Sequence, residues 1–197
     1  MSGFSLGSAR TWHWVSSAIC LVGMILFAVT GITLNHATII KSEPTIIEKE
    51  ASLPDYLIDA ISQESLTEIP DTASSWIKQN LSVKVSRAKA EFSEDEIYIS
   101  LPRAGGDAWM TIDRTTGDIY YEDTDRGMIS FLNDLHKGRN TGTAWMWFLD
   151  VFAIACLIFS FTGLWLLIKH GKTRPTTWPL VGLGLLIPWL IILLLMH

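Results

Sequence analysis

Four of the five histidines in this 197-residue chain stand at the ends of long apolar runs. His13 opens the first run and His36 closes it, whereas His136 precedes the second run and His170 follows it. If the two runs pack as antiparallel helices, His13 lies level with His170, and His36 lies level with His136. Two imidazoles facing each other from neighbouring membrane helices can occupy both axial positions of a b-type haem, which needs an apolar slot and no covalent attachment motif.

Small and aromatic residues near these histidines suit the same chemistry. Gly163 lies seven residues before His170, and Gly31 lies five residues before His36, so each helix offers space beside a histidine. Three phenylalanines are close enough in sequence to flank a macrocycle: Phe27, Phe159 and Phe161.

Two other interpretations of the histidines come from the same residues. A histidine at the end of a membrane helix is often a polar anchor in the company of tryptophan, and the chain has nine tryptophans. Zinc or copper is a weaker alternative, because paired histidines without clustered Cys, Asp or Glu leave the metal's ligand shell incomplete. The residues alone leave haem ligation and anchoring open.

The apolar runs indicate an α-helical membrane protein. The chain is 49% hydrophobic, and residues 14–34, 144–168 and 178–196 are each predominantly apolar. A helix needs about 20 such residues to cross the hydrocarbon core, so three transmembrane helices are predicted. The first is expected to be an uncleaved anchor, because it is longer than the apolar part of a signal peptide and no A-x-A-like site follows it.

Basic residues predict the orientation. The short loop after the second run holds Lys169, Lys172 and Arg174 and no acid, which is typical of a cytoplasmic loop. We therefore expect the following segments: a cytoplasmic N-terminus (1–11), transmembrane helix 1 (12–36), a periplasmic domain (37–140), transmembrane helix 2 (141–170), a cytoplasmic loop (171–177) and transmembrane helix 3 (178–197). Asp150, the acid within a span, is expected to serve either function or a structural hydrogen bond.

The segment between the first two spans is acidic. Residues 37–140 hold 11 Lys plus Arg and 19 Asp plus Glu, so their formal charge is 11 − 19 = −8. This charge argues against nucleic-acid binding. Nothing in the segment resembles a nucleophile with its base or a phosphate-binding loop, so we interpret it as a docking or regulatory module.

The same segment predicts a small α+β unit over residues 53–125. "DYLIDAISQ" and "DTASSWIKQNL" are typical of helices, the second with Asp71 or Thr72 as its N-cap. "VKVSRAKAEF", "EIYISLP" and "WMTIDRTTGDIYYED" then alternate as antiparallel strands do. A further helix is expected in "RGMISFLNDLHKG". Cys20 and Cys156 lie inside apolar runs and predict packing rather than a disulfide framework.

Short motifs across nearly the whole chain support a family resemblance. "R-x-x-H-W" opens the first span and "TG-I-x-L-N-H" closes it, and "LHKGRNTG" leads into "WFLD…TGLWLL". With these motifs the chain resembles the PepSY-associated transmembrane family (PepSY-TM), and its α+β unit with "IDRTTGDIYY" is similar to a PepSY module. Larger members of the family include inner-membrane siderophore-iron reductases that carry haem b between membrane histidines. This chain differs from them in having three spans and one outer module.

The resemblance implies a function and a set of ligands. It implies that His13, His36, His136 and His170 are axial ligands of haem b at two sites, inner and outer, in a bacterial inner membrane. The implied activity is that of a ferric (siderophore) reductase, which reduces periplasmic ferric iron or ferric siderophore for iron uptake. Since the sequence has no G-x-G-x-x-G fingerprint, a quinol or a partner flavoprotein would supply electrons. The alternative is a non-catalytic PepSY membrane module that binds or regulates a periplasmic partner.

Helix geometry adds an expectation about assembly. At about 100° per residue, His13 and His36 lie roughly 140° apart around a straight helix, so both cannot face one neighbour. His136 and His170 would differ by roughly 160°, unless Gly138 and Gly142 interrupt the helix. We therefore expect either helix bending or a homodimer with haem at or near the subunit interface.

Overall fold

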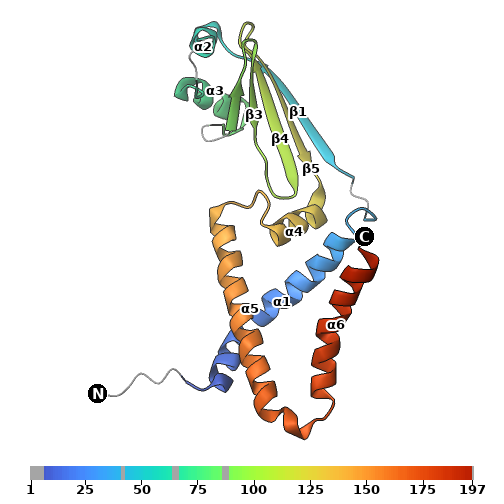
Figure 1. Cartoon of the computed structure of the whole chain (residues 1–197). Coiled ribbons are helices and arrows are strands. Elements are labelled where there is room, and N and C mark those ends of the chain that lie inside the picture. The colour runs from blue at the N-terminus through green and yellow to red at the C-terminus, as the bar shows by residue number, and fades with distance from the viewer. Residues whose placement is uncertain (1–6, 41–42, 64–66, 86–88, 197) are drawn as a thin grey trace, which may run out of the picture. The chain divides into compact units, whose positions relative to one another are not determined.

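A computed structural model describes residues 7–40, 43–63, 67–85 and 89–196 (Figure 1). The chain divides into two compact units. Residues 27–146 form what we call the sheet unit, and residues 1–26 together with 147–197 form the span unit.

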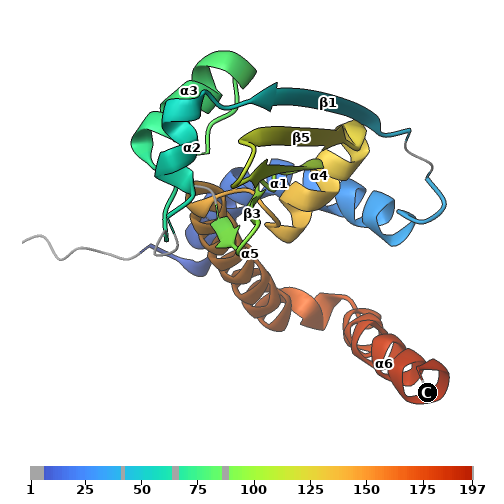
Figure 2. The same cartoon turned by 90° about the horizontal axis from the view of Figure 1, so that it is seen from above.

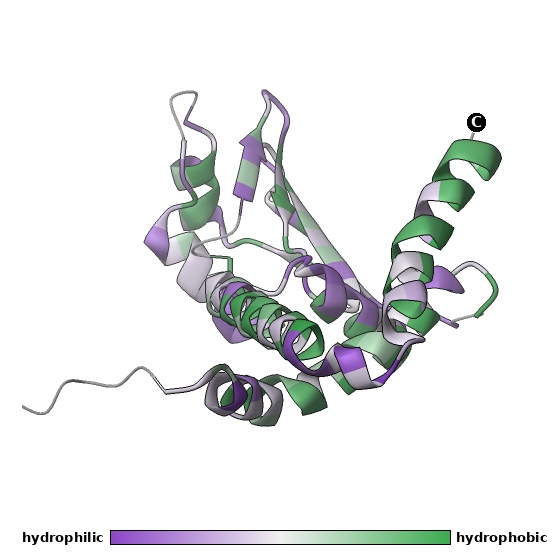
Figure 3. Cartoon of the chain, turned by 60° about the horizontal axis from the view of Figure 1, so that its bottom comes forward, coloured by the Kyte–Doolittle hydropathy of each residue, from purple (hydrophilic) through white to green (hydrophobic). Residues whose placement is uncertain are grey.

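Three helices are long and apolar enough to cross a membrane. They are α1 (Ala9–Asn35), α5 (Thr143–His170) and α6 (Thr177–Leu195). Figure 3 shows α6 coloured mostly as hydrophobic along its length, and neither α5 nor α6 has a buried residue. A helix that is apolar on all sides is typical of a membrane span. With the antiparallel sheet described below, these helices confirm the predicted combination of three candidate spans and a small α+β domain.

Within the span unit, small residues bring α1 close to α5. A Cβ built on Gly23 would lie 2.3 Å from the ring of Phe152, so the phenylalanine occupies the space that glycine leaves. Three residues further towards the N-terminus, Cys20 is fully buried, and it lies near Cys156 of α5. The predicted packing role of both cysteines agrees with these positions.

The sheet unit contains one five-stranded antiparallel sheet in the order β1-β5-β4-β3-β2. Its strands are β1 (Thr45–Ser52), β2 (Lys89–Phe92), β3 (Glu96–Ser100), β4 (Gly106–Asp113) and β5 (Asp118–Asp125). A tight turn joins β4 to β5. The carboxylate of Asp113 stabilises this turn by accepting hydrogen bonds from the backbone N–H groups of Thr115 and Thr116, both at 2.8 Å. Gly117 follows at φ +75°, a conformation that glycine adopts without strain.

One face of the sheet packs against two helices, α2 (Asp55–Ile61) and α3 (Asp71–Leu81). Figure 2 shows these helices together on one side of the sheet. Alternate strand residues and one apolar stripe of each helix form a continuous core, since successive strand side chains point to opposite faces. Its fully buried members include Ile61, Ile77, Ile97, Ile99, Met110 and Ile112.

The other face of the sheet, which we call the open face, is not covered by α2 or α3. It carries three aromatic residues, Tyr98, Trp109 and Tyr120, which alternate with the buried strand positions. Strand register places eight acids and one base, Lys89, on this face. The acids are Glu48, Glu50, Glu91, Glu96, Asp107, Asp113, Asp118 and Glu122.

Three local expectations for this unit differ from the structure. The unit begins earlier than residue 53, because β1 pairs along its whole length with β5. The N-cap of α3 is Pro70, without a side-chain cap, and not Asp71 or Thr72. Val83 and Val85 were expected in a strand but lie outside any strand. Their side chains are nevertheless buried in the core.

A further helix, α4 (Gly127–Lys137), ends where glycine permits a left-handed backbone. Gly138 is the C-cap residue at φ +68°, and Gly142 has φ +79°. The two glycines therefore separate α4 from α5, and His136 belongs to α4. The roughly 160° angle expected between His136 and His170 on one straight helix does not apply.

Candidate functional site

The imidazole of His13, a residue of α1, packs against α5. Its ring stacks on Phe159, with ring centroids 4.6 Å apart and an interplanar angle of 15°. A Cβ built on Gly163 would lie only 3.1 Å from Cε1 of His13, so the glycine leaves room for the imidazole. Gly163 was expected to make space for a macrocycle; here that space holds a histidine.

Hydrogen bonds orient the His13 ring. Its Nδ1 lies 3.1 Å from the backbone oxygen of Phe159 and 3.2 Å from Oγ1 of Thr162. A carbonyl oxygen only accepts hydrogen bonds, so Nδ1 carries the proton and donates it. In a neutral ring the lone pair is then on Nε2, the arrangement that fixes a metal-ligating histidine through its other nitrogen.

His170 has the same arrangement at the end of α5. Its Nδ1 donates to the backbone oxygen of Leu166 at 3.0 Å, which again leaves the lone pair on Nε2. Both histidines line one cavity of about 470 Å³ in the span unit. The remaining lining residues are Arg10, Gly163, Leu166 and Leu167.

The lining of this cavity contains residue types that could hold haem b. Two imidazoles with unprotonated Nε2 atoms are the axial donors that a six-coordinate haem needs. Leu166 and Leu167 supply an apolar wall, and the guanidinium of Arg10 is a partner for a propionate carboxylate. The volume lies within the range of about 300–1,000 Å³ common to cofactor sites.

His136 contacts the other end of α1, within the sheet unit. Its Nδ1 lies 2.7 Å from Oγ1 of Thr30, and its ring centroid is 5.1 Å from that of Phe27. A Cβ on Gly31 would lie 3.6 Å from Cε1 of His136. A histidine of another helix therefore occupies the space beside this glycine too.

His36 is exposed and directs its Nδ1 to the backbone oxygen of Ile32 at 2.9 Å. It follows Gly31, the residue that His136 contacts, by five positions, or roughly 140° around the helix axis. Three cavities of the sheet unit, next to Tyr120, Arg126 and Gly105, are each lined by neither His36 nor His136. His13 and His170 thus line one cavity, whereas His36 and His136 have separate partners, Ile32 and Thr30.

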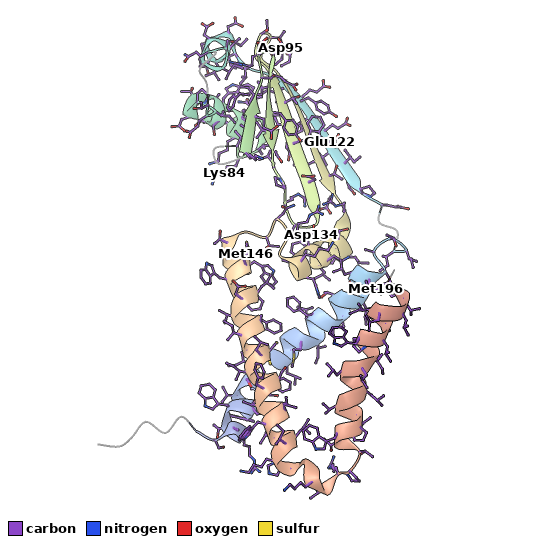
Figure 4. All side chains as sticks on the ribbon, viewed as in Figure 1. Lys84, Asp95, Glu122, Asp134, Met146 and Met196 are labelled. Carbon is purple, nitrogen blue, oxygen red and sulfur yellow. The ribbon has the colours of Figure 1, made fainter. Side chains whose placement is uncertain are left out.

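Polar residues of α4 that sequence reasoning missed connect three elements of the sheet unit. Thr33 of α1 donates to Oδ1 of Asn133 at 2.8 Å, and the backbone N–H of Gly105 donates to Oδ2 of Asp134 at 2.9 Å. Asn133 and Asp134 are both buried, and Figure 4 labels Asp134 on α4. Two adjacent polar residues in the middle of an amphipathic helix are the feature of the sequence that indicates such buried polar contacts.

The sequence also singles out three other residues, Asp150, Phe161 and His197, and neither Asp150 nor Phe161 lines the His13 cavity. Asp150 is exposed on α5. Phe161 is also exposed, at 67% of its surface, and does not flank the His13 cavity. His197 lies outside the described residues. Across residues 7–40, 43–63, 67–85 and 89–196, no three His, Cys, Asp or Glu side chains gather as a metal-ion site.

Fold and site together define a membrane protein with three candidate spans and an α+β domain that separates the first two in sequence. A family model described as PepSY_TM-like matches residues 4–197. The chain therefore belongs to the PepSY_TM-like family. The comparisons with curated proteins and with solved structures gave no match.

Proposed function

We propose that this protein is a haem b-containing electron-transfer protein of the bacterial inner membrane, which reduces periplasmic ferric iron or a ferric siderophore. The observation that carries the proposal is the cavity shared by His13 and His170, in which each histidine has its Nδ1 hydrogen-bonded to a backbone oxygen. The family resemblance supports the ferric substrate, and an external quinol or flavoprotein would donate electrons.

Each residue at the cavity has a defined task in this proposal. Haem, when bound, supplies a one-electron Fe(III)/Fe(II) couple. His13 and His170 would hold the iron through Nε2, while the carbonyl oxygens of Phe159 and Leu166 keep both rings oriented. Gly163 allows His13 to approach α5, Leu166 and Leu167 exclude water, and Arg10 binds a propionate.

A second haem at His36 and His136 remains a prediction of the sequence. His136 would have to leave its contacts with Thr30 and Gly31, or His36 would have to turn towards it, before both could bind one iron. A second copy of the chain could supply the missing ligand instead, as in the homodimer expected from helix geometry.

A spectroscopic experiment tests the inner site. The full-length protein is purified in mild detergent from haem-replete cells, and its haem-to-chain ratio is measured as the pyridine haemochrome. We expect a red protein in which His13→Ala and His170→Ala each remove the same spectral component, because either change breaks one bis-imidazole site. Loss of different components would refute the pairing, and a colourless wild-type protein would refute haem binding.

The outer histidines have their own test. We expect His36→Ala and His136→Ala to abolish reduction of a ferric chelate, while dithionite still reduces the haem at the inner site. Normal ferric reduction by both variants would exclude these histidines from electron transfer.

The second candidate function is that of a non-catalytic membrane module that binds a periplasmic partner. It is favoured by the open face of the sheet, where aromatic and acidic side chains remain uncovered by α2 and α3. A colourless protein that nevertheless binds a partner through this face would establish it in place of the reductase.

A further inference from the structure

The open face of the sheet carries a row of aromatic rings. Trp109 of β4 lies between Tyr98 of β3 and Tyr120 of β5, with ring centroids 6.2 Å and 5.2 Å away. Its Nε1–H donates to Oε1 of Glu122 at 3.3 Å, which holds that carboxylate beside the ring. Figure 4 labels Glu122 on the sheet. These contacts hold the three rings and the carboxylate of Glu122 next to one another on the open face.

Next to this row the sheet is hollowed. A groove of about 930 Å³ is lined by residues of β1, β3, β4 and β5 and of the turn between β2 and β3. Its acidic residues are Glu50, Asp95, Glu96, Asp113 and Asp118, and Tyr120 joins it to the aromatic row. Asp95 is labelled at this end of the sheet in Figure 4. The groove is therefore concave, anionic and partly aromatic.

The basic residues of the sheet unit do not neutralise this surface. With eight acids and one base, the strand positions of the open face have a formal charge of 1 − 8 = −7. Lys49 points away from the open face and donates to the backbone oxygen of Leu81. Arg114 is buried and bonds to backbone oxygens, and Arg103 pairs with Asp123. Lys49, Arg114 and Arg103 thus serve other contacts, whereas Lys89 pairs with Glu91 on the open face itself.

We propose that the open face binds a cationic segment of a partner polypeptide, rich in Lys or Arg. Opposite charges attract the segment, and the faces of Trp109 and the two tyrosines can hold ammonium or guanidinium groups by cation–π interaction. A polypeptide suits the site better than a metal ion. Strands lie about 4.8 Å apart, so the carboxylates from β1 to β3 extend over roughly 15 Å, and the described acids form no metal-ion cluster. This inference extends the second candidate function and does not depend on haem.

A charge-matched comparison tests the proposal on the full-length protein in detergent. The probe is a fluorescein-labelled ten-residue peptide of alternating Lys and Ser, with a Glu-Ser peptide as its negative counterpart. Binding is followed by fluorescence anisotropy at low and high salt. Glu50→Gln/Glu122→Gln removes two charges from the open face, and Asp59→Asn/Glu68→Gln removes two exposed charges from other segments. Trp109→Leu tests the aromatic row.

We expect the Lys-Ser peptide to bind at low salt and the Glu-Ser peptide not to bind. Glu50→Gln/Glu122→Gln should weaken binding by about tenfold, as two lost ion pairs allow, and Trp109→Leu should weaken it severalfold, while Asp59→Asn/Glu68→Gln changes it less than twofold. Unaltered thermal unfolding of each variant verifies the fold. Absence of binding by wild type, or equal weakening by both charge-matched variants, would overturn the proposal. So would equally tight binding of spermine, since a small polycation would then suffice.

Discussion

The ring of His13 fills the space that Gly163 leaves open, since a Cβ at Gly163 would lie 3.1 Å from Cε1 of the imidazole. At the other end of α1 the relationship is reversed, and there the helix contributes a glycine, Gly31, to a contact with His136. In both places a histidine approaches the backbone of a neighbouring helix through the absence of a side chain.

The first prediction concerns Gly163. A Gly163→Val substitution should push His13 away from α5, because overpacking of this kind costs about 1–3 kcal/mol. The haem-to-chain ratio measured as pyridine haemochrome should then fall severalfold. Gly182→Val in α6 is the matched control, since a Cβ there meets nothing within 4 Å. Equal haem content in the two variants would argue against His13 as a ligand.

A second prediction uses the proximity of Cys20 and Cys156. Mild oxidation with copper phenanthroline should form a disulfide between them within one chain, because neighbouring cysteines on packed helices need little backbone movement to bond. Mass spectrometry of a digest would identify the linked peptides. Cys156→Ser should remove the product, whereas a crosslink only between chains would show that α1 and α5 do not pack as described.

The third prediction concerns Asp134. Replacing it with alanine leaves the backbone N–H of Gly105 without its acceptor, which should destabilise the sheet unit by about 1–3 kcal/mol. The measurement is thermal unfolding followed by circular dichroism. Asp107→Ala removes an exposed carboxylate of β4 and should have little effect. A stability loss of the same size in both variants would mean that the Gly105 contact has no special weight.

A fourth prediction follows from the turn between β4 and β5. Backbone N–H groups of Thr116 and Thr115 lower the pKa of Asp113 below its ordinary value. A carboxylate with a lowered pKa in the folded state adds stability above its unfolded pKa, near 4, and loses it as the pH falls through the folded pKa. Asp113→Asn should therefore flatten the loss of stability below about pH 4. Acid unfolding curves of wild type and variant would show whether the two diverge.

Much of the fold follows from local sequence. The spans α1, α5 and α6 are long apolar runs, and β4 and β5 alternate around a Thr-Gly-Asp turn, so length and period suffice to find them. The edge strand β1 was missed because Ile46 and Ile47 are adjacent and break the alternation, and both are exposed. It is a strand because β5 pairs with it, which is a tertiary effect.

The candidate site was predictable to a smaller extent. Counting along the apolar runs places His13 and His170 at one level, whereas the structure places the His13 ring beside Phe159 and Gly163, seven or more residues before His170. One cavity is nevertheless lined by both histidines. The contact of His13 with Gly163 depends on how two helices rotate and slide against each other, which no single run of residues specifies. The same holds for Arg10 at the cavity and for the contact of Thr33 with Asn133.

The pairing of Thr45 with Asp125 joins the first residue of β1 to the last residue of β5. Partners across an antiparallel ladder lie about 4.5–5.5 Å apart, so the chain enters and leaves the sheet at neighbouring points. A segment with adjacent ends can be inserted into a host chain, or replaced by a short linker, with little displacement of the flanking ends. Here such a replacement would also have to supply a partner for Asp134 of α4 in place of Gly105. Residues 45–125 thus form a segment with adjacent ends, which recombination could exchange between membrane proteins as one unit.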